Sequence, residues 1–276
     1  MFLSNFSFSK LIFKVTKLFL VLWLLYLLSS NRIEQFNTLN YSQLNTKIFH
    51  EGTTLNLVIA HPDDEVMFFA PTLLQLDNLM PLSIPINVIC FSNGDAQGLG
   101  EKRQHELQSS IHALIQNQRQ TNVTVLHFQD GNDQIWDIDQ MTQYLPQNDH
   151  QAFLTFDSHG VSGHKNHIAC HNAVWNLKNT NNNVTILTLD SIHHSLLAKY
   201  TFFIIDLVKL YWNLWKDQQQ PQWESHDKIT FFNAYSQYIL AYSTMLNAHK
   251  SQVVWFRYGW WAFSRFVFSN HLKITT

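Results

Sequence analysis

Short apolar runs alternate with helical patterns from residue 55 onward, and this alternation leaves the chain few possible folds. Five runs have the length and the apolar, β-branched composition of strands that are covered on both faces. They span residues 55–59, 86–91, 123–128, 152–156 and 184–189. Helical patterns lie between them, at 64–77, 101–118, 134–145 and 165–178. This order predicts an α/β domain with a Rossmann-like, doubly wound and mainly parallel sheet.

Polar side chains follow four of these runs at the point where each predicted strand ends. The first cluster is His61, Asp63, Asp64 and Glu65, and the others lie at 92–95, 129–131 and 157–167. In a doubly wound sheet the carboxyl ends of the strands form one edge, and ligands bind in the crevice outside it. We therefore expect the four clusters to form a single site.

The first cluster places an imidazole and three carboxylates within five positions. A divalent cation would relieve the repulsion among these carboxylates, and mixed nitrogen and oxygen ligands suit zinc or another first-row metal. The alternative is an acidic helix N-terminus, in which Asp63 to Glu65 only complement the helix dipole. We expect Glu65 to be a residue beside the ligands or at the helix start, and not a ligand itself.

A second cluster contains His164 and His167, which are three residues apart beside Gly160 and Gly163. On the first turn of a helix these histidines share one face. Such a pair alone is weak evidence, but two clusters at the same sheet edge support each other. Three protein ligands from two loops would leave a coordination position open for water, as in catalytic metal sites.

Four strings of the sequence resemble a known family, the N-acetylglucosaminyl-phosphatidylinositol (GlcNAc-PI) de-N-acetylases, which are the eukaryotic branch of the LmbE-like deacetylases. The strings are AHPDDE, SNGDAQGLGEKRQHEL, SHGVSGHKNH and the C-terminal HKSQVVWFRYGWWAFSRF. The resemblance runs from about Thr54 to Leu272. It implies an LmbE-like fold and a zinc-dependent hydrolase of a linear amide. Such an enzyme produces glucosaminyl-phosphatidylinositol during biosynthesis of the glycosylphosphatidylinositol (GPI) anchor.

The resemblance also implies catalytic roles for residues of the two clusters. His61, Asp64 and His167 would bind the metal, and Asp63 would be the general base. A protonated His164 would polarise the scissile carbonyl and, with the metal, stabilise the oxyanion. The metal is expected to be Zn²⁺, with another divalent first-row metal as the alternative.

Residues of the neighbouring loops are expected to bind the substrate. Arg103 and Glu106 match family positions near the sugar or phosphate, and Asp95 belongs to the same group. The alternative for Arg103 and Glu106 is a local helical salt bridge. Asp130 lies in a third loop and has less evidence. Asn166 replaces an acidic residue of some bacterial relatives, which we interpret as a variation beside the ligands and not as lost activity.

The N-terminus differs in kind from the rest of the chain. Residues 18–28 read LFLVLWLLYLL, and the apolar stretch extends back to Leu11 if Lys14 and Lys17 extend toward the lipid headgroups. A membrane anchor is favoured over a cleaved signal peptide. The expected organisation is an anchor at 1–30, a linker at 31–53 and the catalytic domain at 54–276, which ends in an aromatic membrane-proximal segment.

The net charge of −2 gives no reason to expect nucleic acid as a partner. The expected partners are a membrane glycolipid as substrate and the lipid bilayer. Cys90 and Cys170 form no metal-binding or disulfide motif, and we expect both in the core.

Two arguments disagree about the side of the membrane on which the domain lies. Lys10, Lys14 and Lys17 precede the apolar run, so the positive-inside rule directs the domain to the lumen. The resemblance implies a single-pass protein of the endoplasmic reticulum with its domain on the cytoplasmic face, which we adopt. Glycosylation at any of the sequons Asn40, Asn122 and Asn183 would show a luminal domain.

Three other functions remain open at this point. The chain could deacetylate another N-acetylglucosamine conjugate, or it could be a catalytically silent, membrane-anchored binding protein. Two histidines and one carboxylate also describe non-haem iron oxygenases, although the alternation of strand and helix argues against their barrel folds.

Overall fold

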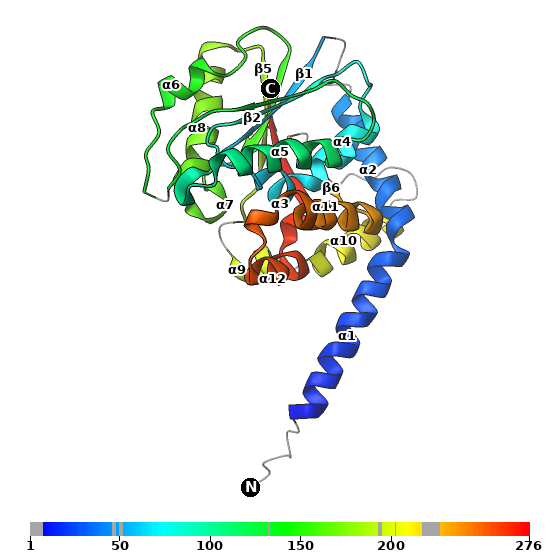
Figure 1. Ribbon diagram of the computed structural model, residues 1–276. Coiled ribbons are helices and arrows are strands. Elements are labelled where there is room, and N and C mark those ends of the chain that lie inside the picture. The colour runs from blue at the N-terminus through cyan, green and yellow to red at the C-terminus, as the bar shows by residue number, and fades with distance from the viewer. Residues whose placement is uncertain are drawn as a thin grey trace.

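The computed structural model describes residues 8–45, 48–49, 52–131, 133–192, 195–201, 203–216 and 227–276. Its centre is a seven-stranded sheet of order β3-β2-β1-β4-β5-β7-β6 with helices packed around it (Figure 1). The strands are β1 (Thr54–Ile59), β2 (Ile86–Cys90), β3 (Thr121–Val125), β4 (Gln151–Phe156), β5 (Val184–Leu189), β6 (Lys228–Phe232) and β7 (Ser269–Thr275).

Strands β1 to β5 are all parallel, and the chain winds outward in both directions from the central pair β1 and β4. Leu57 in β1, for example, pairs with Val88 of β2 and with Leu154 of β4. Right-handed crossovers in two opposite directions put the helices of the two halves on opposite faces of the sheet. The predicted doubly wound α/β fold is therefore confirmed.

The helices connect and cover the strands in the expected alternation. They are α1 (Phe8–Leu28), α2 (Ser30–Asn45), α3 (Asp64–Phe68), α4 (Ala70–Leu79), α5 (Gly100–Leu114), α6 (Ile138–Gln143), α7 (Gly160–Gly163), α8 (Lys165–Thr180), α9 (Leu196–Thr201), α10 (Phe203–Lys216), α11 (Tyr235–Ala248) and α12 (Trp255–Phe263). Three short 3₁₀ helices are η1 (Asp95–Gln97), η2 (Lys250–Gln252) and η3 (Arg265–Val267).

The observed elements differ from the sequence prediction at several places. The helix expected at 64–77 is broken at Phe69 into α3 and α4, because Pro71 in the first turn of α4 has no N–H to continue the α3 ladder. Strand β3 begins and ends earlier than expected. Strands β6 and β7 were not predicted, and they extend the sheet as an antiparallel pair.

The stretch that was expected to be a linker is helical over Ser30–Asn45 and packs against β6. Asn37 of α2 donates to the carbonyl of Phe232 (2.8 Å) and accepts from the N–H of the same residue (3.0 Å). Asn40 donates to the carbonyl of Thr230 (2.6 Å). Helix α2 thus covers the outer edge of β6. Its asparagines bind backbone groups there that would otherwise be free to pair with a strand of another chain.

Helix α1 projects away from the domain (Figure 1). Its residues Ser9–Leu28 are long and apolar enough to cross a membrane, and few of them are buried. Inside the domain, Cys90 and Cys170 are both buried and unpaired, as expected.

Candidate active site

The loops after β1 and β4 meet at the centre of the sheet, where the direction of winding reverses. His61 and Asp64 follow β1, and His167 lies on α8 after β4. One potential ligand atom from each of these three residues lies within 4.8 Å of the others, and all three residues are buried. The structure therefore brings together the three side chains that were expected to bind a metal.

Asp64 is held by backbone groups of its own loop. Its Oδ2 accepts hydrogen bonds from the N–H groups of Ala60 (3.1 Å) and His61 (2.9 Å), and its Oδ1 lies 3.3 Å from Nε2 of His167. Burial alone would raise the pKa of Asp64, but the nearby His167 and His61 lower it below its ordinary value. The carboxylate is ionised at neutral pH, as a metal ligand must be.

Two contacts fix the orientation of the His167 ring. Its Nδ1 lies 3.2 Å from the carbonyl oxygen of Gly160, and the ring stacks on Phe156 with centroids 4.0 Å apart. An N–H that donates to a backbone carbonyl leaves the other nitrogen with a free lone pair. Nε2, which faces Asp64, is thus the nitrogen available to a metal.

A strained turn aims the Gly160 carbonyl at His167. Val161 has φ 65° and ψ −64°, which is rare for a β-branched residue. Its N–H donates to Oγ of Ser191 (2.6 Å), and its carbonyl accepts from the Lys199 ammonium. Surrounding contacts of this kind are needed to hold such a conformation, which is typical of functional sites.

His61 is oriented by Asp130, for which the sequence had given little evidence. Nε2 of His61 lies 3.1 Å from Oδ1 of Asp130, while Nδ1 lies 3.9 Å from Oδ2 of Asp64. Burial lowers the pKa of His61, but the bond to Asp130 and the charge of Asp64 raise it above its ordinary value. A carboxylate that is hydrogen-bonded to one ring nitrogen of a histidine orients the other ring nitrogen toward a metal. Asn166 also contacts this ring, with its Nδ2 3.0 Å from Nε2.

His164 lies against both of the other histidines, with ring centroids 5.1 Å from His61 and 4.7 Å from His167. Its Nδ1 accepts a hydrogen bond from the N–H of Asn166 (3.3 Å). Burial, together with the two neighbouring histidines, lowers the pKa of His164 to about 4. This lowered pKa does not favour the protonated His164 that was expected. A neutral ring that accepts this hydrogen bond on Nδ1 carries its proton on Nε2 and can still donate a hydrogen bond.

Asp63 is buried beside the three ligands in a left-handed conformation (φ 111°). Its N–H donates to Oε2 of Glu65 (3.1 Å), and its Oδ2 lies 2.6 Å from Nη2 of Arg257 on α12. Burial raises the pKa of Asp63; Arg257 and Arg103 oppose this effect without cancelling it. A carboxylate with a raised pKa accepts a proton more readily, which suits a general base.

The C-terminal string supplies partners to three buried carboxylates around the site. Besides Arg257, His249 places Nε2 2.5 Å from Oε1 of Glu65, and both side chains are fully buried. Ser251 donates to Glu106 through its N–H (2.9 Å) and its hydroxyl (2.5 Å). Glu65 thus lies in the first turn of α3 but is buried and paired with His249 instead of being solvated. The sequence analysis had assigned no role in the site to His249, Ser251 or Arg257.

The three residues expected to bind substrate have different surroundings. Arg103 donates to the carbonyls of Gly94 (2.9 Å) and Pro62 (2.8 Å), and its Nη1 lies 3.6 Å from Asp130. Asp95 is exposed and accepts from the N–H of Gly100 within its own loop (2.7 Å). Glu106 is bound by Ser251 as described. The helical salt bridge considered for Arg103 and Glu106 is not among the contacts of the described residues.

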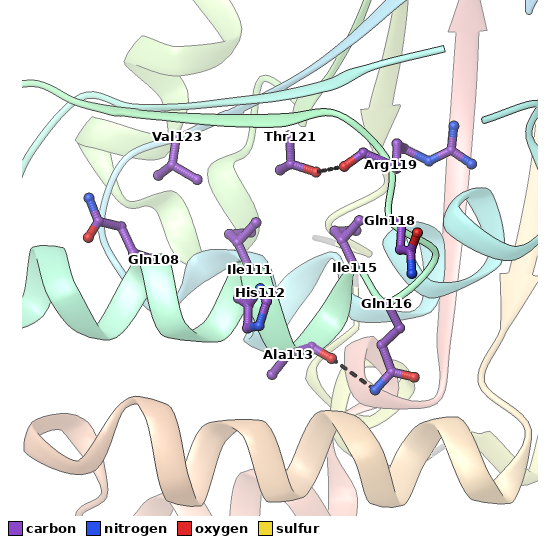
Figure 2. Close-up of a pocket in the computed structure, with 10 residues that line it drawn as sticks. All are labelled: Gln108, Ile111, His112, Ala113, Ile115, Gln116, Gln118, Arg119, Thr121 and Val123. Carbon is purple, nitrogen blue, oxygen red and sulfur yellow. Dashed lines mark hydrogen bonds between the residues drawn. The ribbon is translucent and has the colours of Figure 1, made fainter. Parts of the chain in front are cut away.

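A separate cavity of about 740 Å³ lies between α5 and β3 (Figure 2). Its lining includes Ile111, Ile115 and Val123 and contains no carboxylate. Arg119, at its rim, is committed to an ion pair with Asp77 (3.1 Å). None of its lining residues belongs to the strand-end clusters, so this cavity is not part of the site.

Comparison with known proteins gives a consistent result. The PIG-L family, described as GlcNAc-PI de-N-acetylase, matches residues 56–178. The N-acetylglucosaminyl-phosphatidylinositol de-N-acetylase of Saccharomyces cerevisiae is 43% identical over 295 aligned positions, covering 98% of this chain and 97% of the relative. The enzyme of the same name from Bos taurus is 33% identical over 80% of this chain and 83% of its own length.

Among solved structures, N,N'-diacetylchitobiose deacetylase from Pyrococcus horikoshii has a TM-score of 0.51 and 14% identity. The match covers 99% of this chain and 95% of that structure. At this level of identity the similarity concerns the fold alone.

The pair formed by His249 and Glu65 yields a stability prediction. His249→Phe leaves the Glu65 carboxylate buried without its cationic partner, and we expect it to reduce the free energy of unfolding by about 3 kcal/mol. Thermal unfolding of the detergent-solubilised chain measures this loss. His112→Phe, at an exposed histidine of α5, is the matched control and should leave the melting temperature unchanged. Equal melting temperatures for the two variants would contradict the assignment.

Proposed function

The chain belongs to the GlcNAc-PI de-N-acetylase family, and we propose that its strand-end site hydrolyses the N-acetyl group of GlcNAc-PI. The products are acetate and glucosaminyl-phosphatidylinositol, so the reaction is a step of GPI-anchor biosynthesis. The observation that supports this most is the convergence of His61, Asp64 and His167 beside the buried carboxylate of Asp63.

The donor set fits a divalent metal, and we propose zinc. Two imidazoles and one carboxylate are the ligands that catalytic zinc sites use, with a further position left open. Both imidazoles have one nitrogen occupied by an oxygen partner, Asp130 for His61 and Gly160 for His167, so each presents its other nitrogen toward Asp64. A bound cation would supply Lewis acidity, polarising the acetamide carbonyl and lowering the pKa of a coordinated water.

Asp63 is the proposed general base. It takes a proton from the water that attacks the acetamide carbon, and its raised pKa makes this transfer easier. Arg257 binds Oδ2 and thereby fixes the rotation of the carboxylate, which leaves Oδ1 to receive the proton. The strained backbone of Asp63 persists because Arg257 and Glu65 hold it from both sides.

His164 is the proposed donor to the oxygen of the scissile amide. Negative charge develops on this oxygen as the tetrahedral intermediate forms, and the Nε2–H of neutral His164 donates to it. The carbon–nitrogen bond then breaks, and Asp63 returns its proton to the departing amine. One water is consumed, and one acetate and one free amine are produced.

Substrate binding is proposed for Arg103, whose guanidinium lies beside Asp130 at the edge of the site. We propose that it donates to sugar or phosphate oxygens of the headgroup. We propose that Asp95 and Glu106 support binding indirectly. Asp95 holds the glycine-rich loop through Gly100, and Glu106 holds the C-terminal string through Ser251.

Acetate release from GlcNAc-PI by the purified full-length chain is the direct test. We expect activity to be lost on chelation and restored by zinc. Asp63→Asn removes the base and should lower turnover at least 100-fold, within the usual range for general-base catalysis. Asp133→Asn, at an exposed aspartate, is the matched control and should retain full activity. Failure of the zinc-loaded wild-type chain to release acetate would refute the proposed function.

For location, we propose a single-pass protein of the endoplasmic reticulum with α1 as anchor and the domain on the cytoplasmic face. Asn122 and Asn183 are exposed sequons, whereas Asn40 is buried in α2 and cannot report on sidedness. We expect Asn122 and Asn183 to remain unglycosylated when the chain is made with microsomes. An added N-terminal extension that carries a sequon provides the positive control. A shift in mass on endoglycosidase treatment that depends on Asn122 or Asn183 would instead show a luminal domain.

A further inference from the structure

Helices α9, α10 and α12 lie at the end of the domain from which α1 projects (Figure 1). These helices expose large apolar side chains. Six of these residues, each between 54% and 85% exposed, define what we call the docking face: Leu196, Leu197, Val208, Trp212, Trp255 and Phe256. Exposed apolar patches of this kind usually mark sites of protein or membrane interaction.

The docking face is continuous with α1. Phe19 of α1 contacts the ring of Phe263 at the end of α12, with centroids 6.3 Å apart. At the other end of this stretch, the hydroxyl of Ser29 lies 2.6 Å from that of Tyr211 on α10. Helix α9 contacts α12 as well, because the ring centroids of Tyr200 and Trp260 lie 5.8 Å apart. The four helices therefore form one connected surface.

The geometry of α1 indicates how deep this surface would lie in a lipid bilayer. The apolar stretch Ser9–Leu28 has 20 residues and is about 30 Å long, which is the thickness of a bilayer's hydrocarbon core. Phe19 precedes Leu28 by nine residues, or about 14 Å along the helix axis. If α1 spans the bilayer, α12 meets it near the bilayer midplane, so the docking face lies within the hydrocarbon of one leaflet.

The charged side chains that the structure describes on these helices and on η3 are turned inward. Lys199 donates to the carbonyl of Val161, Arg257 pairs with Asp63, and Arg265 pairs with Asp206 at 2.6 Å. Among the described side chains of α9, α10, α12 and η3, no charged group is exposed. A water-facing surface normally exposes charged groups and buries apolar ones. The opposite arrangement, with apolar groups outside and ion pairs inside, suits contact with lipid.

We propose that the docking face inserts into the same leaflet that α1 crosses, so that the domain is embedded in the bilayer surface rather than tethered above it. The inference rests on α1 spanning the membrane, as proposed above. It does not depend on the reaction that the site catalyses.

The test uses an environment-sensitive fluorophore on single introduced cysteines of the full chain, reconstituted in phosphatidylcholine vesicles. The labelled variants are Val208→Cys and Phe256→Cys on the docking face, Leu20→Cys in α1, and Leu82→Cys as control. Leu82 is 60% exposed in the loop before β2, at the opposite edge of the sheet. Cys90 and Cys170 are buried, and the unmodified chain gives the background of labelling.

We expect lipids that carry a nitroxide on the acyl chain to quench positions 208 and 256 at least twofold, while aqueous iodide quenches only position 82. If positions 208 and 256 respond like position 82 while position 20 is quenched by lipid, α1 is an anchor and the docking face is not inserted. Protection of positions 208 and 256 from both quenchers would mean that a protein, such as a second copy of the chain, covers the face; this also overturns the proposal. Acetate release, measured separately, reports on the proposed function whatever the labels show.

Discussion

Burial of three consecutive carboxylates is the constraint on which the site depends. Asp63, Asp64 and Glu65 are 5%, 2% and 0% exposed, and charged groups at such depth need partners of opposite charge. The partners come from separate parts of the chain: histidines of the loops after β1 and β4 serve Asp64, His249 serves Glu65, and Arg257 serves Asp63. The loop after β1 therefore depends on the last third of the chain, because without His249 and Arg257 two of the three charges would be buried unpaired.

The fold places this loop where it can be used. Winding reverses between β1 and β4, so the loops after these two strands separate from the sheet toward opposite faces and leave a crevice between them. Helix α12 connects this crevice to the proposed membrane surface. It directs Arg257 inward to Asp63 and exposes Trp255 and Phe256 outward. In the proposed arrangement a glycolipid headgroup would reach the site while its acyl chains stay in the leaflet.

Local sequence patterns were sufficient to predict the parallel part of the fold and the residues that converge at its centre. Apolar runs mark β1, β2, β4 and β5, and the clusters that follow β1 and β4 contain the residues of the site. The antiparallel pair β6 and β7 was missed because β6 pairs with β7, and β7 with β5, over long sequence separations. The roles of His249 and Arg257 could not be predicted either, since their partners lie 184 and 194 positions away and no spacing rule links them.

The proposed site requires that His61, Asp64 and His167 together hold one metal ion beside Asp63. X-ray absorption at the zinc edge of the zinc-loaded full-length chain reports on these ligands. We expect nitrogen and oxygen ligands at about 2.0–2.1 Å, with outer-shell scattering from two imidazoles that falls to one in His167→Gln. A sulfur shell, or an unchanged imidazole signal in that variant, would show that these three residues do not form the metal site.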